Sequence, residues 1–418
     1  MHENMTILGI TLVVLGYGYV SKFLARLNIS GPMVFTAVGV LLSPLGIGRG
    51  KVAIDSELVQ IVAEIALIII LFSDAASLDL KRLRESWRLP ARLLFIGLPL
   101  CIVLSTAAAR FFFPGEPESY LLLLALVLAP TDAALGKAVV SDRRVPARIR
   151  SVINVESGLN DGIVFPILIT VVTLIVDGTT AGHGSGWLGY VARQIVFGAV
   201  VGAGSGYLGG RLASLVIRRR WMENSFENLV PIALAVFSYY LAEFVGGNGF
   251  ISAFFSGLFL GNFNETLRTH VEDFAESEGE LLALVCFLVF GLAFIPAVLP
   301  FWNFKVMFYS LLSLSLLRMV PVAVSLVGSG LDQWSKMFIG WFGPRGIASL
   351  LYVLIVVHQI GSIKGHEIIY AVIGLTICLS IFAHGISARP LAAVYGKFHT
   401  DNGDQTGRPA HFPGSRKN

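Results

Sequence analysis

The strongest constraint on this chain is a series of apolar runs, each near 20 residues long, separated by short polar stretches. An α-helix needs about 20 apolar residues to cross the roughly 30 Å of hydrocarbon in a bilayer. Only 14% of the 418 residues are charged, whereas soluble domains carry about 25%. A transmembrane β-barrel would instead show segments of about ten residues that alternate in polarity. The sequence therefore predicts an all-α polytopic membrane protein.

The lengths of the apolar runs predict about thirteen transmembrane helices within residues 1–395. The expected spans are 5–26, 31–47, 57–76, 90–113, 119–140, 148–176, 188–217, 227–246, 249–263, 279–299, 304–328, 333–358 and 366–388. Residues 396–418 are polar and rich in Gly and Pro, which predicts a short disordered cytoplasmic tail.

Positive charge alternates along the connections. Those after odd-numbered spans are rich in Lys and Arg, and those after even-numbered spans hold few. Short cytoplasmic loops collect Lys and Arg. We therefore expect a protein of the cytoplasmic membrane with its N-terminus outside and its C-terminus inside; that this membrane is prokaryotic is implied only by the resemblance given below.

Two of the spans are interrupted. Pro130 and Asp132 lie in the middle of 119–140, and Pro344 lies between two glycines in the middle of 333–358. Proline removes a backbone donor and clashes with the preceding turn, and broken backbone at membrane depth persists only where it is buried or lines a cavity. The two breaks lie seven spans apart, which favours an internal inverted repeat with a binding site between its halves.

The sixth span carries the polar groups that are most costly at membrane depth. It contains Glu156, Ser157, Asn160 and Asp161, and one acid there costs about 2.5 to 3.5 kcal/mol. The spacing of four places these residues in two neighbouring rows on one helix face. Oxygen ligands suit a hard cation, so we expect Asp161 to hold either a cation or a proton. The alternative is a structural acid that pairs with an arginine or caps a helix.

Residues at other breaks and span ends are further candidates. Free carbonyls near Thr131 can ligate a cation, because a broken helix leaves carbonyls without partners. Asp132 is expected either to cap the following half-helix or to ligate the ion directly. Asp74, at the end of the third span, is either an outer ligand or an ordinary interfacial acid.

Two arginines lie within predicted spans. Arg345 lies in the second break, and a lone buried charge needs a partner. Glu156 is the acid that most needs one, so we expect a Glu156–Arg345 pair. Arg318 either neutralises the core or extends outward to the membrane surface.

These residues resemble the cation:proton antiporters of the NhaP and sodium/proton exchanger type. The resemblance covers residues 5–390, and its most specific motif is E-S-G-L-N-D at 156–161. The motifs A-P-T-D at 129–132 and G-P-R-G at 343–346 support it in the expected order.

The resemblance implies an NhaA-like antiporter fold of thirteen helices, with inverted repeats and two discontinuous crossing helices. A core domain would move against a dimerisation domain within a homodimer. The site residues would be Asp161 as the shared cation and proton site, Ser157 and the Thr131 carbonyl as sodium ligands, Asn160 to orient the site, Asp132 at the helix crossing, and Glu156 with Arg345 as a stabilising pair. The combination of Asn160 and Arg318 resembles the electroneutral branch, which exchanges one cation for one proton.

The function expected from the sequence is exchange of sodium, with lithium as a further substrate, for protons. The expected partners are the cation, the proton and the lipid bilayer, with no cofactor and no nucleic acid. A potassium/proton antiporter is the main alternative. An intramembrane aspartyl enzyme with Asp132 and Asp161 as a dyad, and a cation channel, are more distant ones.

Overall fold

The computed structural model describes residues 2–45, 57–80, 87–132, 135–177, 186–263, 265–274 and 279–401. All regular secondary structure in these ranges is helical, as predicted. Lys81, Arg82 and Arg84, which belong to the basic connection after the third predicted span, and the tail beyond residue 401 lie outside the described ranges.

The first half of the chain forms the helices α1 (His2–Arg26), α2 (Gly31–Leu42), α3 (Glu57–Ser77), α5 (Arg88–Arg92), η1 (Leu93–Gly97), α6 (Leu98–Phe112), α7 (Glu118–Val127), α8 (Lys137–Val140), α9 (Ala147–Asp177) and α10 (Gly186–Arg218). The second half forms α11 (Asn224–Phe244), α12 (Gly249–Phe263), α13 (Glu265–Phe274), α14 (Glu280–Val289), η3 (Phe290–Phe294), α15 (Ile295–Val298), η4 (Leu299–Phe301), α16 (Phe304–Leu314), α17 (Leu316–Ser325), α18 (Gln333–Trp341), α19 (Ile347–Ile360) and α20 (Glu367–Asp401). Elements η1 and η3 are single π-helical turns inside longer helices.

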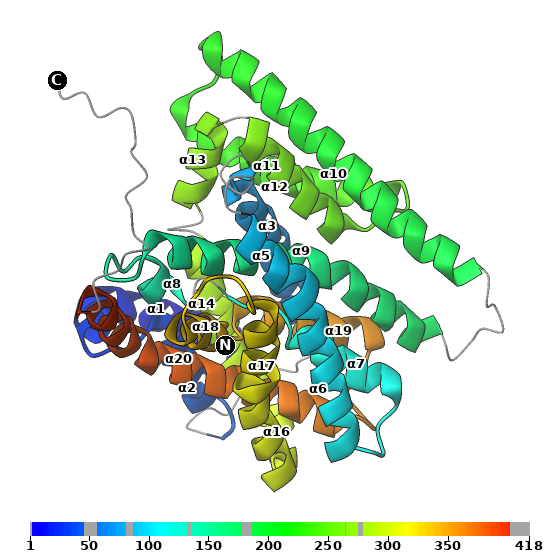
Figure 1. Ribbon diagram of the computed structural model, residues 1–418. Helices are drawn as coiled ribbons and strands as arrows, with labels where there is room; N and C mark the ends of the chain where they lie inside the picture. The colour runs from blue at the N-terminus through cyan, green and yellow to red at the C-terminus, as the bar shows by residue number, and fades with distance from the viewer. Residues whose placement is uncertain are drawn as a thin grey trace.

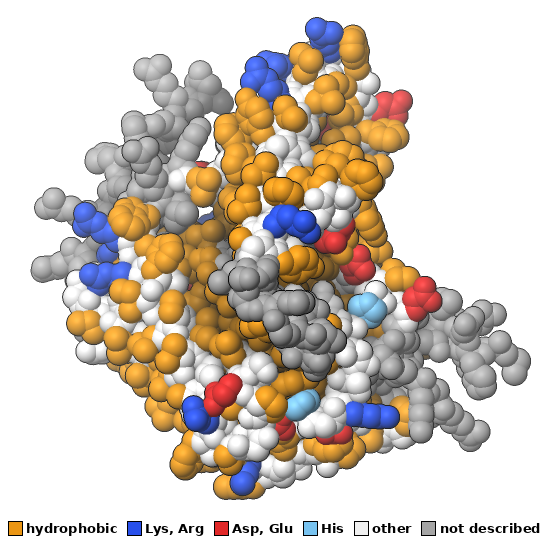
Figure 2. Space-filling model, turned by 90° about the vertical axis from the view of Figure 1, so that its right-hand side faces the viewer, with side chains coloured by type: hydrophobic (Ala, Val, Ile, Leu, Met, Phe, Trp, Pro, Cys, Tyr) orange, Lys and Arg blue, Asp and Glu red, His pale blue; other side chains and the backbone are white. Residues whose placement is uncertain are grey.

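Seven helices in the described ranges are long and apolar enough to cross a membrane. They are Val59–Ser77, Arg88–Phe112, Ala147–Val176, Gly189–Arg218, Glu280–Phe301, Phe304–Ser325 and Glu367–Phe398. Four shorter apolar helices accompany them, namely α2, α7, α12 and α19. Figure 2 shows hydrophobic side chains over much of one face of the molecule, with charged side chains confined to small groups. The exact number of thirteen spans stays a prediction.

Both predicted helix breaks are present. The span 119–140 is divided into α7 and α8, and the span 333–358 is divided into α18 and α19. Two boundaries differ from the prediction. The span 304–328 is interrupted between α16 and α17, and α20 continues as helix to Asp401, past the boundary expected at residue 395.

The helices gather in two groups. Figure 1 shows α10, α11, α12 and α13 together in the upper part of the view, and α14 and α16 to α20 in the lower part. Glycines bring three helices of the upper region into close contact. At Gly202 and Gly206 of α10, a Cβ atom would lie within 2.3 Å of a carbonyl oxygen of α12. At Gly257 and Gly261 of α12, it would lie 2.0 Å from a carbonyl oxygen of α3. Small residues allow such close backbone approach between membrane helices.

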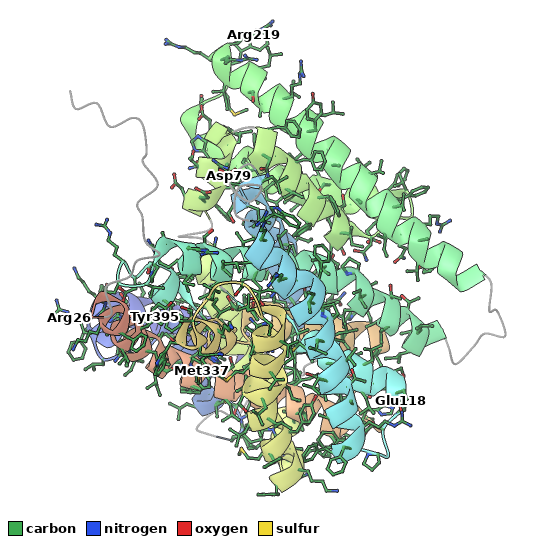
Figure 3. All side chains as sticks on the ribbon, in the orientation of Figure 1. Arg26, Asp79, Glu118, Arg219, Met337 and Tyr395 are labelled. Atoms are coloured by element: carbon green, nitrogen blue, oxygen red, sulfur yellow. The ribbon has the colours of Figure 1, made fainter. Side chains whose placement is uncertain are left out.

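Charged residues of different connections lie on opposite sides of the molecule. Figure 3 places Arg26, Asp79 and Arg219 toward the left and top of the view and Glu118 at the lower right. The connections after the first, third and seventh predicted spans thus share a side, and the connection after the fourth does not. The orientation of these sides in the membrane stays a prediction.

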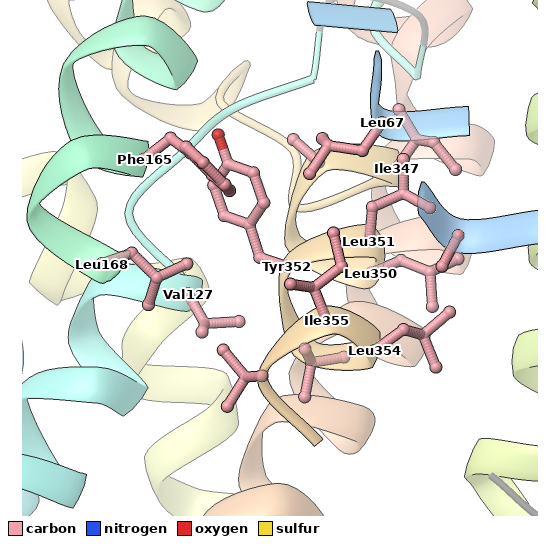
Figure 4. Close-up of a cluster of buried hydrophobic side chains, with 14 of the residues drawn as sticks. Leu67, Val127, Phe165, Leu168, Ile347, Leu350, Leu351, Tyr352, Leu354 and Ile355 are labelled. Carbon is pink, nitrogen blue, oxygen red and sulfur yellow. The ribbon is translucent and has the colours of Figure 1, made fainter. Parts of the chain in front are cut away.

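The half-helix α19 lies at the centre of the main hydrophobic core. All of its residues from Ile347 to Val357 are buried. Figure 4 shows this helix packed against side chains of α3, α7 and α9, including Leu67, Val127 and Phe165. The break that precedes α19 is therefore held inside the protein.

Candidate ion-binding site

Two broken helices meet inside the molecule. After α7 the chain is non-helical as far as Asp132, and between α18 and α19 it is irregular from Phe342 to Gly346. Each irregular stretch contains a proline, which cannot donate the hydrogen bond that a helix would need. The backbone N–H of Asp132 donates to the carbonyl oxygen of Pro344 at 2.9 Å, so the two breaks are directly bonded.

The Asp132 carboxylate caps α19 and also accepts from the chain just before α8. Its Oδ2 accepts from the backbone N–H of Ile347 at 2.7 Å, where α19 begins, and its Oδ1 accepts from the N–H of Leu135 at 3.3 Å. A Cβ atom at Gly346 would lie 1.9 Å from Oδ2, so the chain requires glycine there. A carboxylate at a helix N-terminus satisfies free N–H groups and complements the helix dipole. Between the two roles left open for Asp132, this geometry favours the cap.

The Arg345 side chain satisfies the opposite ends of the broken helices. Its Nη1 donates to the carbonyl oxygens of Ala129 and Pro130 at 3.2 Å each, and to that of Gly343 at 3.3 Å. The arginine is 1% exposed. Carbonyl ends of helices carry partial negative charge, so the guanidinium stabilises both breaks from the carbonyl side as Asp132 does from the amide side.

The structure corrects the predicted ion pair. Glu156 pairs with Arg318, whose Nη2 lies 2.7 Å from Oε1 of Glu156, rather than with Arg345. Arg345 is engaged by three carbonyls instead. The helix turns at Ser315, whose hydroxyl donates to the carbonyl of Leu311 at 2.6 Å, and such a bond bends helices. Arg318 follows this bend and is buried beside Glu156, so of its two open roles it neutralises the core.

The polar rows of α9 hold the first break. The Ser157 hydroxyl donates to the carbonyl oxygen of Thr131 at 2.6 Å, and Nδ2 of Asn160 donates to Oγ1 of Thr131 at 2.7 Å. All three residues are buried. The predicted ligands Ser157 and Thr131 therefore lie together with Asn160, the residue expected to orient the site, and the Ser157 oxygen keeps lone pairs for a cation.

Asp161 lies in the same region with unused acceptor capacity. The residue is 3% exposed, and within the described part of the chain its Oδ1 has no hydrogen-bond partner. The Tyr352 hydroxyl of α19 donates to the backbone carbonyl oxygen of Asp161 at 3.2 Å. In Figure 4 the Tyr352 ring lies beside Phe165 of α9. A buried carboxylate oxygen without a partner is costly, and a cation or a proton would relieve that cost.

Asp161 lines a cavity of about 180 Å³. Polar side chains from three other elements line it with Asp161 and Ser157, namely Ser73 and Asp74 of α3, Thr131 and Asp132 of the first break, and Glu280 of α14. Asp74, for which an interfacial role was equally open, therefore faces the same space as Asp161. The volume is ample for a cation with several waters, since one water occupies about 30 Å³ of liquid.

The sequence was not used to predict three residues near the site. Ser73 precedes Asp74 in the sequence, so placing Asp74 at the cavity also predicts that Ser73 lies near it. Glu280 is the second residue of the predicted span 279–299 and the first residue of α14, and it carried no site prediction. Tyr352 is one aromatic residue in an apolar run, and nothing in the sequence distinguishes it from a core residue.

The chain matches the family described as sodium/hydrogen exchanger, transmembrane, over residues 9–394. It belongs to this family. The sequence is 26% identical over 396 residues to the K(+)/H(+) antiporter NhaP of Alkalimonas amylolytica, covering 93% of this chain and 67% of that protein. It is 23% identical to the Na(+)/H(+) antiporter of Schizosaccharomyces pombe, covering 88% and 84%. Against the K(+)/H(+) antiporter NhaP2 of Shewanella baltica the identity is 24%, and the chain spans 62% of that relative's length.

Solved structures have the same fold. The sodium proton antiporter MjNhaP1 of Methanocaldococcus jannaschii superimposes with a TM-score of 0.77 at 20% identity, covering 95% of this chain and all of that one. An electron-microscopy structure of MjNhaP1 gives a TM-score of 0.71. The exchanger is therefore an all-α, multi-pass membrane protein with an antiporter fold.

The family and its neighbours are transporters, not enzymes. The site geometry agrees, because an aspartyl dyad would need two carboxylates that share a proton. Both oxygens of Asp132 accept from backbone N–H groups instead. The aspartyl enzyme and the cation channel are therefore set aside.

Proposed function

We propose that this chain exchanges sodium for protons across the cell membrane by alternating access, with the two ions competing for Asp161. The observation that carries the proposal is the buried Asp161 carboxylate, whose Oδ1 has no hydrogen-bond partner in the described part of the chain and which lines the 180 Å³ cavity. A carboxylate in that state gains from binding either ion, and it cannot bind both at once.

Oxygen atoms suited to a monovalent cation surround this carboxylate. We assign the Ser157 hydroxyl and the Thr131 carbonyl as further ligands, since they bond to each other at 2.6 Å beside Asp161. Asp74 of α3 faces the same cavity and is proposed as a ligand from the opposite wall. Asn160 is assigned to hold Thr131 in place through its bond to Oγ1.

We propose a stoichiometry of one cation for one proton. Arg318 and Glu156 neutralise each other within the core. Asn160 is uncharged and already bonded to Thr131. Asp161 then carries one cation across the membrane in one direction and one proton in the other. The two positive charges cancel, so no net charge moves in a cycle.

We propose that the C-terminus lies on the cytoplasmic side of the membrane, because Lys and Arg collect in the connections after odd-numbered spans. The prokaryotic cytoplasmic membrane is proposed from the family resemblance. A homodimer with inverted repeats and a moving core is proposed from the family resemblance, with the broken helices and α9 in that core.

Potassium/proton exchange is the second candidate. Two of the relatives are named K(+)/H(+) antiporters. The same oxygen ligands accept either cation, and selectivity depends on cavity size and ligand field.

The deciding experiment places the purified protein in liposomes and reads internal pH with a dye. A sodium gradient, a potassium gradient or a lithium gradient drives proton movement, with the membrane potential clamped at two values. Proton movement with sodium, at a rate independent of potential, is expected. A rate that depends on the membrane potential would refute one-for-one exchange. Proton movement with potassium alone would mean that the protein exchanges potassium and not sodium.

Competition at one carboxylate also predicts a bell-shaped dependence of the rate on pH. Protons displace the cation at low pH, and protons become scarce as the second substrate at high pH. A flat profile would contradict a shared site.

A further inference from the structure

We propose that Ser380 and His384 of α20 are positioning residues that hold the second break and keep Arg345 in place. This inference rests on the exchange proposed above, because its consequence is an effect on cation binding. Neither residue lines the cavity, so each acts through the break.

The two side chains contact the break on both sides. The backbone N–H of Arg345 donates to the Ser380 hydroxyl at 2.7 Å. On the other side, Nε2 of His384 lies 2.9 Å from the carbonyl oxygen of Trp341, the last residue of α18. The Trp341 indole also donates to the Ser387 hydroxyl at 3.1 Å. One face of α20 therefore supplies both an acceptor and a donor to the break.

The Trp341 carbonyl oxygen only accepts, so Nε2 of His384 donates to it. In the neutral ring Nδ1 accepts from the Ser380 hydroxyl at 3.1 Å, and in the protonated ring it donates to the Ser380 carbonyl oxygen at 3.0 Å. In the neutral form a continuous chain of bonds connects the Arg345 N–H to the Trp341 carbonyl.

The break needs these partners because water does not reach it. Ser380 and His384 are 0% and 1% exposed. The end of a helix leaves backbone groups without intrahelical partners, and such groups are costly when buried. A spacing of four places both side chains on the same face of α20, so one helix face can replace the missing helical bonds.

The position of this backbone affects the ion site in two ways. The N–H that Ser380 binds belongs to the residue whose guanidinium holds the Ala129 and Pro130 carbonyls. Two residues later, the Ile347 N–H donates to Asp132, which lines the cavity. A shift of the break would therefore move groups on both sides of Thr131.

The test combines amide hydrogen exchange with transport. Ser380→Ala and His384→Ala should accelerate hydrogen exchange at the backbone amides of Phe342, Gly343, Arg345 and Gly346. Both should raise the half-saturating sodium concentration by about tenfold, the effect of one buried hydrogen bond whose partner is left unpaired. His384→Gln retains an N–H donor for Trp341 and should restore most of the affinity.

Thr376→Val provides the matched control. Its hydroxyl is buried one turn earlier on α20 and donates to the Val372 carbonyl of the same helix at 2.7 Å. It should alter neither measurement. Unchanged amide exchange in Ser380→Ala would show that Ser380 does not hold the second break. Two results would show that the bonds from α20 do not affect transport: faster amide exchange with unchanged sodium affinity, or a sodium affinity of His384→Gln as low as that of His384→Ala. Wild-type protein that moves no cation would refute sodium/proton exchange itself, while the amide measurement would still test whether α20 holds the break.

Discussion

The two helix breaks have similar supports but different surroundings. A long neighbouring helix holds each break with two polar side chains. Ser157 and Asn160 of α9 bind the first break, and Ser380 and His384 of α20 bind the second. The residue after Asn160 is the acid Asp161, whereas α20 has no acid between its first and last residues.

The two acids near the first break differ in their hydrogen bonding, which distinguishes a structural acid from a transport acid. Asp132 is buried, and both of its oxygens accept from backbone N–H groups. Asp161 is equally buried, yet within the described residues its Oδ1 has no such partner. The two acids are therefore distinguished by the hydrogen-bond partners of their carboxylate oxygens and not by their burial. Ion binding is expected only beside the first break.

Replacing Asp161 gives the largest expected effect. Asp161→Asn keeps the shape but removes the charge that binds a cation and the group that binds a proton. Exchange should fall to the level of empty liposomes while the protein stays folded, as measured by the pH dye and by size-exclusion chromatography.

Asp142→Asn is the matched control for that substitution. Asp142 lies in the connection before α9, 2.7 Å from Arg144, and the hydrogen bond from the Arg144 guanidinium holds the pKa of this carboxyl below its usual range. It is therefore ionised at neutral pH, and it lies outside the predicted spans. Exchange should be unchanged. Exchange retained by well-folded Asp161→Asn would move the ion site to another residue.

The buried ion pair gives the next largest effect. Arg318→Met removes the partner of Glu156 and leaves a buried carboxylate uncompensated, which costs about 3 to 5 kcal/mol. The thermal midpoint of the purified protein should fall accordingly.

A second substitution shows which arginine is the partner. Adding Glu156→Gln to Arg318→Met should recover most of the lost stability, because the uncompensated charge is gone. The same addition to Arg345→Ala should recover little, since Arg345 donates to the carbonyls of both breaks. The reverse pattern would restore the pair that the sequence predicted.

Crowding at the crossing gives a smaller effect. Gly346→Ala would place a Cβ atom 1.9 Å from Oδ2 of Asp132 and displace the carboxylate from its amides. The expected loss is about 1 to 3 kcal/mol for buried groups left without partners, measured as thermal stability, with a matching loss of exchange. Gly204→Ala is the control, because no atom lies within 4 Å of a Cβ there. Equal behaviour of the two variants would mean that Asp132 does not cap α19.

The sequence predicts the elements of this fold better than their contacts. Apolar run length and proline placement gave the helical class and both breaks, because those features depend on local chemistry and on the bilayer. The break at Ser315 was missed, because serine is compatible with helix and no proline or glycine stands at that position. Arg318 and Glu156 lie on helices far apart in the sequence, so their pairing could not be predicted from spacing.

The candidate site shows the same limit. Thr131, Ser157, Asn160 and Asp161 could be identified because polar groups are conspicuous within apolar spans. The role of His384 could not, because it depends on which backbone groups lie across from α20. Tyr352 is hidden for a similar reason, as one ring among many apolar neighbours.

Tyr352→Phe gives the smallest effect and tests how firmly α19 holds the ion site. It removes only the hydroxyl that donates to the Asp161 carbonyl at 3.2 Å. The expected cost is about 1 kcal/mol, or about fivefold in the half-saturating sodium concentration. Tyr309→Phe is the control, because its buried hydroxyl donates to the Ser105 carbonyl at 2.9 Å, away from the cavity. If both variants lower stability equally and neither changes sodium affinity, the Tyr352 bond supports the core and not the site.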